Sequence, residues 1–393
     1  MHRTLLWGAV VVLGFGCGDE SDDDLVEDAE AITGCNSVTT VLLYSENTFE
    51  FTLPNAFAAT QDPCTRYFVD LPHLAADHTM PRAGADKVHA LGPNFHALAE
   101  FSFSGWAAWI AQSPGTRSWY LAGKLFRRRM VDAGYGVAAG DTWVINELPS
   151  STRSGINNVR ENEADLVRGL FEGDGVHVQG IVFMAGIGQT LQNFSVYKPN
   201  VQDWLQDTAF WNAMKANVRW FSYEVYADPH VNCVIDSNVV ADSDHLNAYL
   251  EHVPRLAEAG GARTATAAAY LKRSYVPLLN AAWNSDNGFG DNLIPLLPFE
   301  KFSRLQVYAT HVWAANNAFP GRRIGFAWSP KSATTTDQQE LAGIIARSVA
   351  RSYPAGGFFN LGKLACSSSG ALEGCGCQVD GAYNPGWGAF ASW

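Results

Sequence analysis

Strand-like runs alternate with helical patterns along most of this chain, and this alternation limits the folds open to it more than any other feature. Seven runs rich in β-branched and aromatic residues predict strands at 38–44, 66–70, 95–103, 142–147, 178–184, 220–226 and 323–328. Apolar residues at helical spacing predict helices at 117–134, 157–171, 201–217, 243–259, 264–281 and 299–318, and again from Thr336. Strands separated by helices form βαβ units, which indicate a parallel sheet.

A (β/α)8 barrel of the TIM type fits this pattern best, with one strand unidentified because the chain reads as helical between 230 and 320. A doubly wound sheet is the alternative. Its usual GxGxxG loop is missing, since Gly186-x-Gly188 has no third glycine, and there is no P-loop. We expect the barrel to span 35–353. Residues 354–393, rich in Gly, Cys and aromatics, are expected to form a disulfide-pinned extension.

Residues 1–16 have the layout of an export signal. Arg3 supplies a short positive region, and an apolar stretch from Leu5 to Phe15 follows it. This stretch is too short for a typical transmembrane helix. Small Gly16 then precedes Cys17.

This layout resembles a bacterial lipoprotein signal, which is cleaved before a cysteine that then takes lipid. One departure is that Leu13 stands four residues before Cys17, where the usual pattern has three. Residues 17–34 form an acidic tether, with eight acids and no base between 19 and 30. The resemblance implies an exported protein that is anchored to a membrane through lipid on Cys17. Ordinary secretion is the alternative.

The acidic charge balance does not identify a partner. The chain has 27 Lys and Arg against 39 Asp and Glu, a net charge of −12, and much of that excess lies in the tether. A nucleic-acid binder would need a basic face, so we expect no nucleic-acid partner. We also expect a monomer without a cofactor.

The cysteine count agrees with export. Six of the seven cysteines remain once Cys17 is set aside, and an even number in an exported chain indicates up to three disulfides. We expect a Cys35–Cys64 bridge and a bridge from Cys366 into Cys375-Gly-Cys377. A zinc site is the alternative, but no CxxC or nearby His completes a tetrahedral ligand set.

Polar and aromatic residues stand at the ends of the predicted strands. They are Tyr44, Glu46, Asp70, Glu100, Asn146, Glu147, Glu224 and Trp328. In parallel α/β barrels the catalytic groups lie at the carboxyl ends of the strands. Carboxylates that meet there repel one another and differ in burial, which separates their pKa values into an acid and a base. The sequence therefore predicts an acidic site at this end of the barrel.

The run Trp143-Val-Ile-Asn-Glu147 resembles the fourth strand of the large clan of barrel glycoside hydrolases whose acid/base is the Glu of an Asn-Glu pair. It is the fourth predicted strand here as well. The resemblance implies that Glu147 is the general acid/base and that Asn146 contacts the sugar hydroxyl next to the scissile bond. Trp328 resembles the aromatic residue that ends the last strand of that clan and forms the floor of the sugar site.

Glu224 is the candidate for the second carboxylate, as nucleophile or base. The clan carries its nucleophile on strand seven, whereas 220–226 is the sixth predicted strand here. Glycoside hydrolysis needs one carboxyl group to protonate the leaving oxygen and another to attack or to activate water. The residues expected to bind the sugar are Asn146, Tyr223, Tyr226, Trp328, Asp70 and Glu100. An exported glycoside hydrolase acting on a poly- or oligosaccharide is thus the first hypothesis.

Two other functions stay open. A non-catalytic surface lipoprotein would bind glycan with the same aromatic mouth and would not turn it over. A metal-dependent hydrolase would draw its ligands from His73, Asp77, His78, Asp228 and His230. No HExxH helix supports that third reading, and we expect no metal site.

Overall fold

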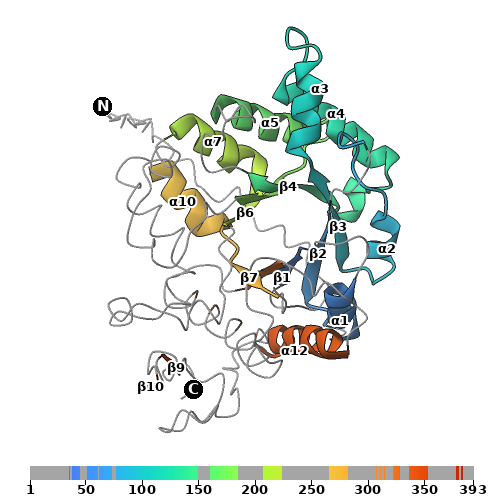
Figure 1. Ribbon diagram of the computed structural model, residues 1–393, viewed down its shortest axis with the longest axis vertical. Coiled ribbons are helices and arrows are strands. Elements are labelled where there is room, and N and C mark those ends of the chain that lie inside the picture. Colours follow the sequence, from blue (N-terminus) through green and yellow to red (C-terminus); the bar gives the residue numbers. More distant parts are fainter. Residues whose placement is uncertain are drawn as a thin grey trace, which may run out of the picture.

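The computed structural model describes residues 35, 38–44, 51–60, 62–72, 77–148, 160–184, 207–223, 265–281, 307, 310, 314, 322–327, 336–352, 378–379 and 382–383. Within them, eight strands form one parallel sheet in the order β6-β5-β4-β3-β2-β1-β8-β7. The strands are β1 (Thr39–Leu43), β2 (Thr65–Leu71), β3 (Phe95–Phe101), β4 (Thr142–Leu148), β5 (Gly180–Met184), β6 (Val218–Tyr223), β7 (Leu278–Asn280) and β8 (Arg323–Ala327). They run around a common centre, with the helices outside (Figure 1).

The sheet closes into a nearly complete barrel between β6 and β7. Tyr275, just before β7, forms a parallel bridge with Phe221 of β6. The Val276 N–H donates to the Phe221 carbonyl at 2.9 Å, and the Ser222 hydroxyl donates to the Val276 carbonyl at 2.7 Å. This closure confirms the predicted (β/α)8 barrel and excludes the doubly wound alternative, whose sheet would stay open.

The strand that the sequence did not reveal is β7. The helix predicted over 264–281 is wrong beyond Ser274, where helix α10 (Ala265–Ser274) ends and the chain continues into the barrel wall. Pro277 explains the change, because proline has no N–H for a helix and disfavours helical backbone in the residue before it. A strand of three residues is also too short to show a period of two.

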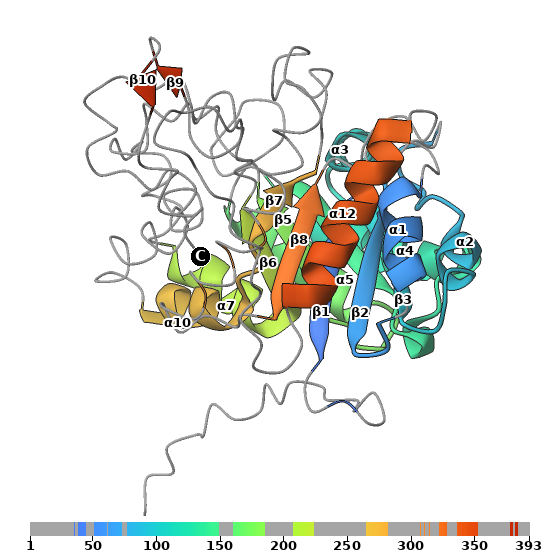
Figure 2. The ribbon, with the colours of Figure 1, turned by 90° about the horizontal axis from the view of Figure 1, so that it is seen from below.

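The helices cover the outside of the barrel. They are α1 (Thr52–Thr60), α2 (Ala85–His89), α3 (Phe103–Ala111), α4 (Trp119–Asp132), α5 (Arg160–Glu172), α7 (Thr208–Asn217), α10 and α12 (Thr336–Ser352), with a 3-10 turn η2 (Val137–Ala139) before β4. The predictions for α4, α5, α7 and α12 are confirmed in their described residues, whereas α1, α2 and α3 were missed because they are short. The last helix, α12, packs beside the first, α1 (Figure 2).

Two separate cores follow from the alternation of side chains along the strands. One set fills the barrel lumen and consists of Leu42, Tyr44, Phe68, Leu98, Val144, Ile181, Phe183, Trp220, Val276, Leu278 and Ala327. The larger set packs between the strands and the helices, and it includes Trp106 of α3 and Trp211 of α7, both fully buried. Because apolar side chains fill the middle of the lumen, polar residues of the same alternation lie at its two ends.

The predicted Cys35–Cys64 disulfide is present, with 5.6 Å between the two Cα atoms, and it joins the segments that lead into β1 and β2. Cys17 and the remaining cysteines lie outside the described residues. In the C-terminal stretch, β9 (Gln378–Val379) and β10 (Ala382–Tyr383) form a small antiparallel pair. Among the described residues, no helix combines the length and the apolar character needed to cross a membrane.

Candidate active site

Four polar side chains lie on the lumen side at the carboxyl ends of β1 to β4. Each stands two residues beyond an apolar residue of the lumen core, and alternation therefore places it on the same face. We call these residues the mouth layer; they are Tyr44, Asp70, Glu100 and Asn146. The prediction that Asp70, Glu100 and Asn146 share one end of the barrel is thus in accord with the strand register.

The amide of Asn146 is held by two neighbours in this layer. Its Nδ2 donates to the Tyr44 hydroxyl at 2.7 Å, and the same nitrogen lies 3.4 Å from Oε1 of Glu100. The ring of Phe183 packs edge-on against that of Tyr44, with 6.1 Å between centroids. With its nitrogen directed at protein oxygens, Asn146 has its amide oxygen available as an acceptor for a ligand hydroxyl.

Asp70 lies fully buried near the end of β2. Burial raises the pKa of the nearby Tyr135 phenol well above its usual value, and the negative charge of Asp70 adds to this shift. Tyr135 therefore stays protonated and donates to the Arg82 carbonyl at 2.9 Å, which fastens the segment that follows β2. Asp70 is thus a fully buried carboxyl group at the mouth end of the lumen.

The pairing between β4 and β5 shifts at the end of β4. Ile145 pairs with Val182 and Leu148 with Met184, so three steps along β4 match two along β5. Ile145 and Leu148 both pack in the helix-side core, although strict alternation would put them on opposite faces. A β-bulge therefore spans the two residues between them, the second of which is Glu147. Bulges of this kind occur next to active sites, where they re-aim a side chain.

The other predicted site residues lie at the edge of the described structure or beyond it. Glu147 belongs to β4 and Tyr223 is the last residue of β6, but the structure does not describe their side chains. Glu224, Tyr226, Trp328 and Cys17 fall outside the described residues. Glu224 directly follows the sixth strand, and Trp328 directly follows the eighth.

The strand count bears on the resemblance to the hydrolase clan. With β7 identified, Glu224 follows strand six, and strand seven consists of Leu278, Leu279 and Asn280. The described residues of β7 thus carry an amide at the strand end where the clan carries its nucleophile. The expected Asn-Glu pair does end strand four.

Tyr44 and Phe183 are site residues that sequence reasoning did not assign. Tyr44 stands at a predicted strand end, but its partner Asn146 is on a strand three places away in the sheet. The sequence signal that could have indicated Phe183 is the alternation of side chains along a strand. Phe183 lies two residues after Ile181 in the same apolar run, so the two side chains share a face.

Within the described residues, no group of three or more His, Cys, Asp and Glu side chains is placed to hold a metal ion. Asp77 instead accepts from the N–H and the hydroxyl of Thr79, at 2.9 and 2.7 Å, in a local turn. His73, Asp228 and His230, which the metal hypothesis also needs, lie outside the described residues.

No family model and no curated protein sequence matches this chain. Among solved structures it is similar to a family 51 α-L-arabinofuranosidase from Bifidobacterium longum, with 10% sequence identity and a TM-score of 0.40. The match covers 80% of this chain and 72% of that enzyme. A likeness of this degree gives no information about activity, so the assignment of function depends on the site itself.

Proposed function

We propose that this protein is a glycoside hydrolase in which Glu147 is the general acid/base and Glu224 the second carboxylate. The observation that supports it most is the mouth layer. Asn146, whose amide is oriented by Tyr44 and Glu100, immediately precedes Glu147 at the bulged end of β4. Such a bulge brings two successive residues to one face of a strand, which suits a substrate contact beside a proton donor.

The chemistry assigns a role to each group. Glu147 would protonate the glycosidic oxygen as the bond breaks, and Glu224 would attack the anomeric carbon or activate a water. The Asn146 amide oxygen would accept from a sugar hydroxyl. Tyr223, Tyr226 and Trp328 would supply flat apolar area with polar edges for the sugar ring.

The first experiment tests turnover and Glu147 together. The full chain is screened on p-nitrophenyl pyranosides and furanosides and on polysaccharides, with release of nitrophenol or reducing ends as the readout. Removing a general acid costs about 10²–10⁴-fold, so Glu147→Gln should lower kcat by that factor on the polysaccharides. Glu340→Gln on the exposed side of α12 is the matched control and should leave kcat unchanged. A fully active Glu147→Gln variant would rule out the assignment.

The second carboxylate is tested by the stereochemistry of the product. Proton NMR during hydrolysis shows whether the anomer is retained or inverted, which corresponds to carboxyl separations of about 5–5.5 Å or about 6.5–9.5 Å. Glu224→Gln should remove turnover as Glu147→Gln does. If Glu224→Gln stays active, the role passes to a carboxylate of the mouth layer, and Glu100→Gln and Asp70→Asn identify which one.

A second candidate function is glycan binding without turnover. The observation that favours it is Asn280, an amide residue at the end of the described part of β7. This candidate predicts saturable binding of oligosaccharides in calorimetry with no product after prolonged incubation. Glu147→Gln would then bind as well as the parent. Product formation by the parent chain would exclude it.

We also propose that the chain is exported and held at a membrane by lipid on Cys17, which follows the apolar stretch of residues 5–15. Expression in a bacterium with labelled palmitate tests this. The parent chain should take up label and sediment with membranes, and Cys17→Ser should do neither. A parent chain that carries no label would favour ordinary secretion.

A further inference from the structure

A cavity of about 360 Å³ lies among the starts of the strands, at the end of the barrel opposite the mouth layer. Phe68 and Trp220 of the lumen core form its inner wall, so packed apolar side chains separate it from the mouth. Phe171 and the exposed His177, whose ring centroids are 4.7 Å apart, line it as well. The size of the cavity is at the lower end of the range for small-molecule sites.

The imidazole ring of His96 is held in one orientation at this cavity. Its Nδ1 donates to the Ala139 carbonyl at 2.7 Å, since a carbonyl can only accept. The ring also packs against Phe68, with 5.0 Å between the centroids. A Cβ at Gly140 would lie 2.7 Å from Nδ1, and Gly140 has a φ of +88°, so only glycine lets this turn approach the ring. Three neighbours thus fix the imidazole.

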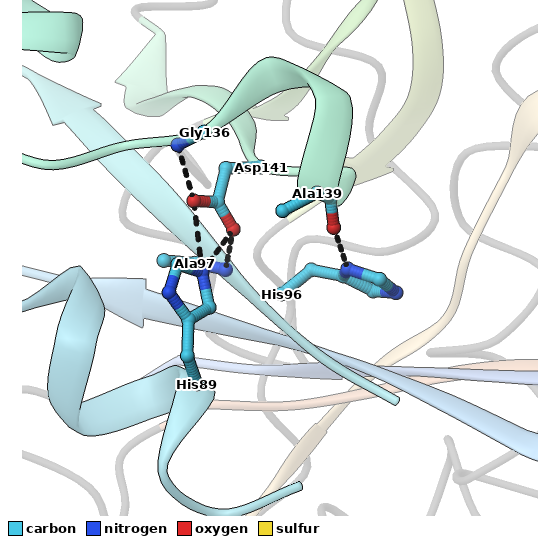
Figure 3. A network of polar contacts seen from close by, with 6 residues as sticks. All are labelled: His89, His96, Ala97, Gly136, Ala139 and Asp141. Atoms are coloured by element: carbon cyan, nitrogen blue, oxygen red, sulfur yellow. Dashed lines mark hydrogen bonds and ion pairs between the residues drawn. The ribbon is translucent and has the colours of Figure 1, made fainter. Parts of the chain in front are cut away.

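The other ring nitrogen of His96, Nε2, is available as a hydrogen-bond acceptor. Figure 3 shows it on the side of the ring away from Ala139. In the same view the Asp141 carboxylate is directed at His89, 2.9 Å away, and at two backbone N–H groups. Within the described part of the chain, no group hydrogen-bonds to Nε2 of His96. Because His96 lines the cavity, a ligand there can use this nitrogen.

His96 is uncharged at neutral pH. Burial lowers the pKa of His96, and the electrostatic effects of Arg66 and His89 add to this, although the Ala139 hydrogen bond and Asp141 act in the opposite direction. The pKa therefore lies below the usual value of about 6.5, and the single proton stays on Nδ1. An imidazole in this form accepts from a hydroxyl group at Nε2 and cannot donate there.

The charged side chains of the lining do not favour an ionic ligand. Arg66 and Arg219 each interact with other groups of the protein, and Asp141 keeps a charge that acts on His96. An ion that entered the cavity would lose hydration without meeting an unopposed counter-charge. An uncharged ligand avoids this cost, and the side chains of Phe171 and Val137 offer it apolar surface.

We propose that this amino-terminal cavity is a ligand site, separate from the mouth, for a small uncharged ring that carries a hydroxyl group. The hydroxyl donates to Nε2 of His96, and the ring packs on the apolar part of the lining. A phenol and a pyranose sugar share this chemistry. The fixed imidazole lowers the cost of binding, because its orientation is set before the ligand enters. The inference does not depend on the proposed hydrolase activity.

Titration of the isotope-labelled full chain, followed by NMR, tests the proposal with two pairs of probes. Phenol is compared with toluene, and D-glucose with its fully O-methylated form, so that each pair differs in hydroxyl groups. We expect phenol or glucose to saturate the site with a Kd of about 1 mM or tighter. Its hydroxyl-free counterpart should bind at least about tenfold more weakly, since it leaves Nε2 without a donor. Which of the two binds identifies the kind of ring.

The histidine side-chain resonances test the role of His96 directly. Two-dimensional ¹H–¹⁵N spectra should show His96 with its proton on Nδ1, and the Nε2 resonance should shift as phenol or glucose saturates the site. His96→Phe keeps a flat ring beside Phe68 and removes the acceptor, so it assigns this resonance and should bind both members of a pair equally. A proton on Nε2 in the parent chain would overturn the proposal.

A second variant connects the binding to the cavity. Val137→Trp fills the cavity from the turn η2 and should weaken binding at least about tenfold. Val131→Trp, at a position of α4 that is 65% exposed and outside the lining, is the matched control and should bind as the parent does. If one cavity variant fails to fold, as judged by circular dichroism, the other decides. The absence of saturation by phenol and glucose, or parental affinity in folded Val137→Trp, would also overturn the proposal.

Discussion

The two ends of the barrel carry opposite chemistry on the same strands. Along the lumen face, β2 begins with Arg66 and ends with Asp70, while β3 begins with His96 and ends with Glu100. Fully or largely buried apolar residues lie between them in each strand. The comparison shows that a packed lumen core can separate basic side chains from acidic ones within the length of one strand.

The ends also differ in how they are fastened. The amino-terminal end holds the Cys35–Cys64 disulfide and the three-donor network of Asp141. The mouth holds the Tyr44–Asn146 hydrogen bond between side chains that a hydrolase would use. This is the division usual in such barrels, where one face supplies stability and the other supplies chemistry.

The largest effect on stability should come from Asp141→Ala at the amino-terminal end. The change leaves the buried N–H of Ala97 and the partly buried N–H of Gly136 without their acceptor, and the loss of an acceptor for a buried donor costs about 1–3 kcal/mol. We expect the free energy of unfolding in urea to fall by about 3–5 kcal/mol. Asp165→Ala, a partly exposed residue of α5, should change it by less than about 0.5 kcal/mol. Equal losses of unfolding free energy in Asp141→Ala and Asp165→Ala would show that the Asp141 network does not stabilise the amino-terminal end.

Removing the disulfide should have the next largest effect. Cys35 and Cys64 are 29 residues apart, and the chain-entropy estimate for a loop of that length is about 3–4 kcal/mol. The double variant Cys35→Ser/Cys64→Ser should lower the unfolding free energy by that amount and leave kcat at the mouth unchanged. A large loss of kcat in the folded double variant would show that the two ends are coupled.

Tyr44→Phe should affect function more than stability. It removes the hydroxyl that accepts from Asn146 and keeps the ring that packs on Phe183. We expect the unfolding free energy to fall by about 1 kcal/mol or less, with about a tenfold drop in kcat if the mouth is catalytic. Tyr120→Phe, which removes the hydroxyl bonded to Glu172 on the outer surface, is the control and should leave kcat intact. A Tyr44→Phe variant with parental kcat would contradict a role for the mouth layer.

The smallest effect is a pH dependence from His96. Its folded-state pKa lies below the usual 6.5, so the unfolded chain binds a proton more readily than the folded one. The stability that this histidine contributes is present above pH 6.5 and is lost as the pH falls from 6.5 through the lower, folded-state pKa. His96→Gln should flatten the slope of unfolding free energy against pH in this window, measured in urea. An unchanged slope would show that the ring is not held neutral.

Much of the barrel could be predicted because its signals are local. Runs such as 95–103 and 178–184 carry enough apolar and β-branched residues to indicate a strand without knowledge of the fold. The prediction failed at β7, where three residues follow a helix, and at short helices such as α2, where few residues establish a period. Short elements are decided by their neighbours, because burial supplies the energy that local preference lacks.

In the candidate site, too, local features could be predicted from the sequence and features that depend on strand pairing could not. That Asp70, Glu100 and Asn146 end strands was readable from the sequence, and parallel strands bring such ends together. The bulge at Glu147 was not readable, because it consists of a shift in pairing between β4 and β5. The sequence also did not show that Asn280 ends a strand, because this residue can be assigned to a strand end only after β7 has been identified.

The sequence by itself determined the alternation of strands and helices, the Cys35–Cys64 pair as a candidate bridge, and the polar residues that end each strand. Only the tertiary structure decided that β6 meets β7 through Phe221 and Tyr275, and that Tyr44 reaches Asn146. The physical reason is that local preferences act over a few residues. Contacts across a barrel depend instead on strand order, stagger and closure, which all eight strands fix together.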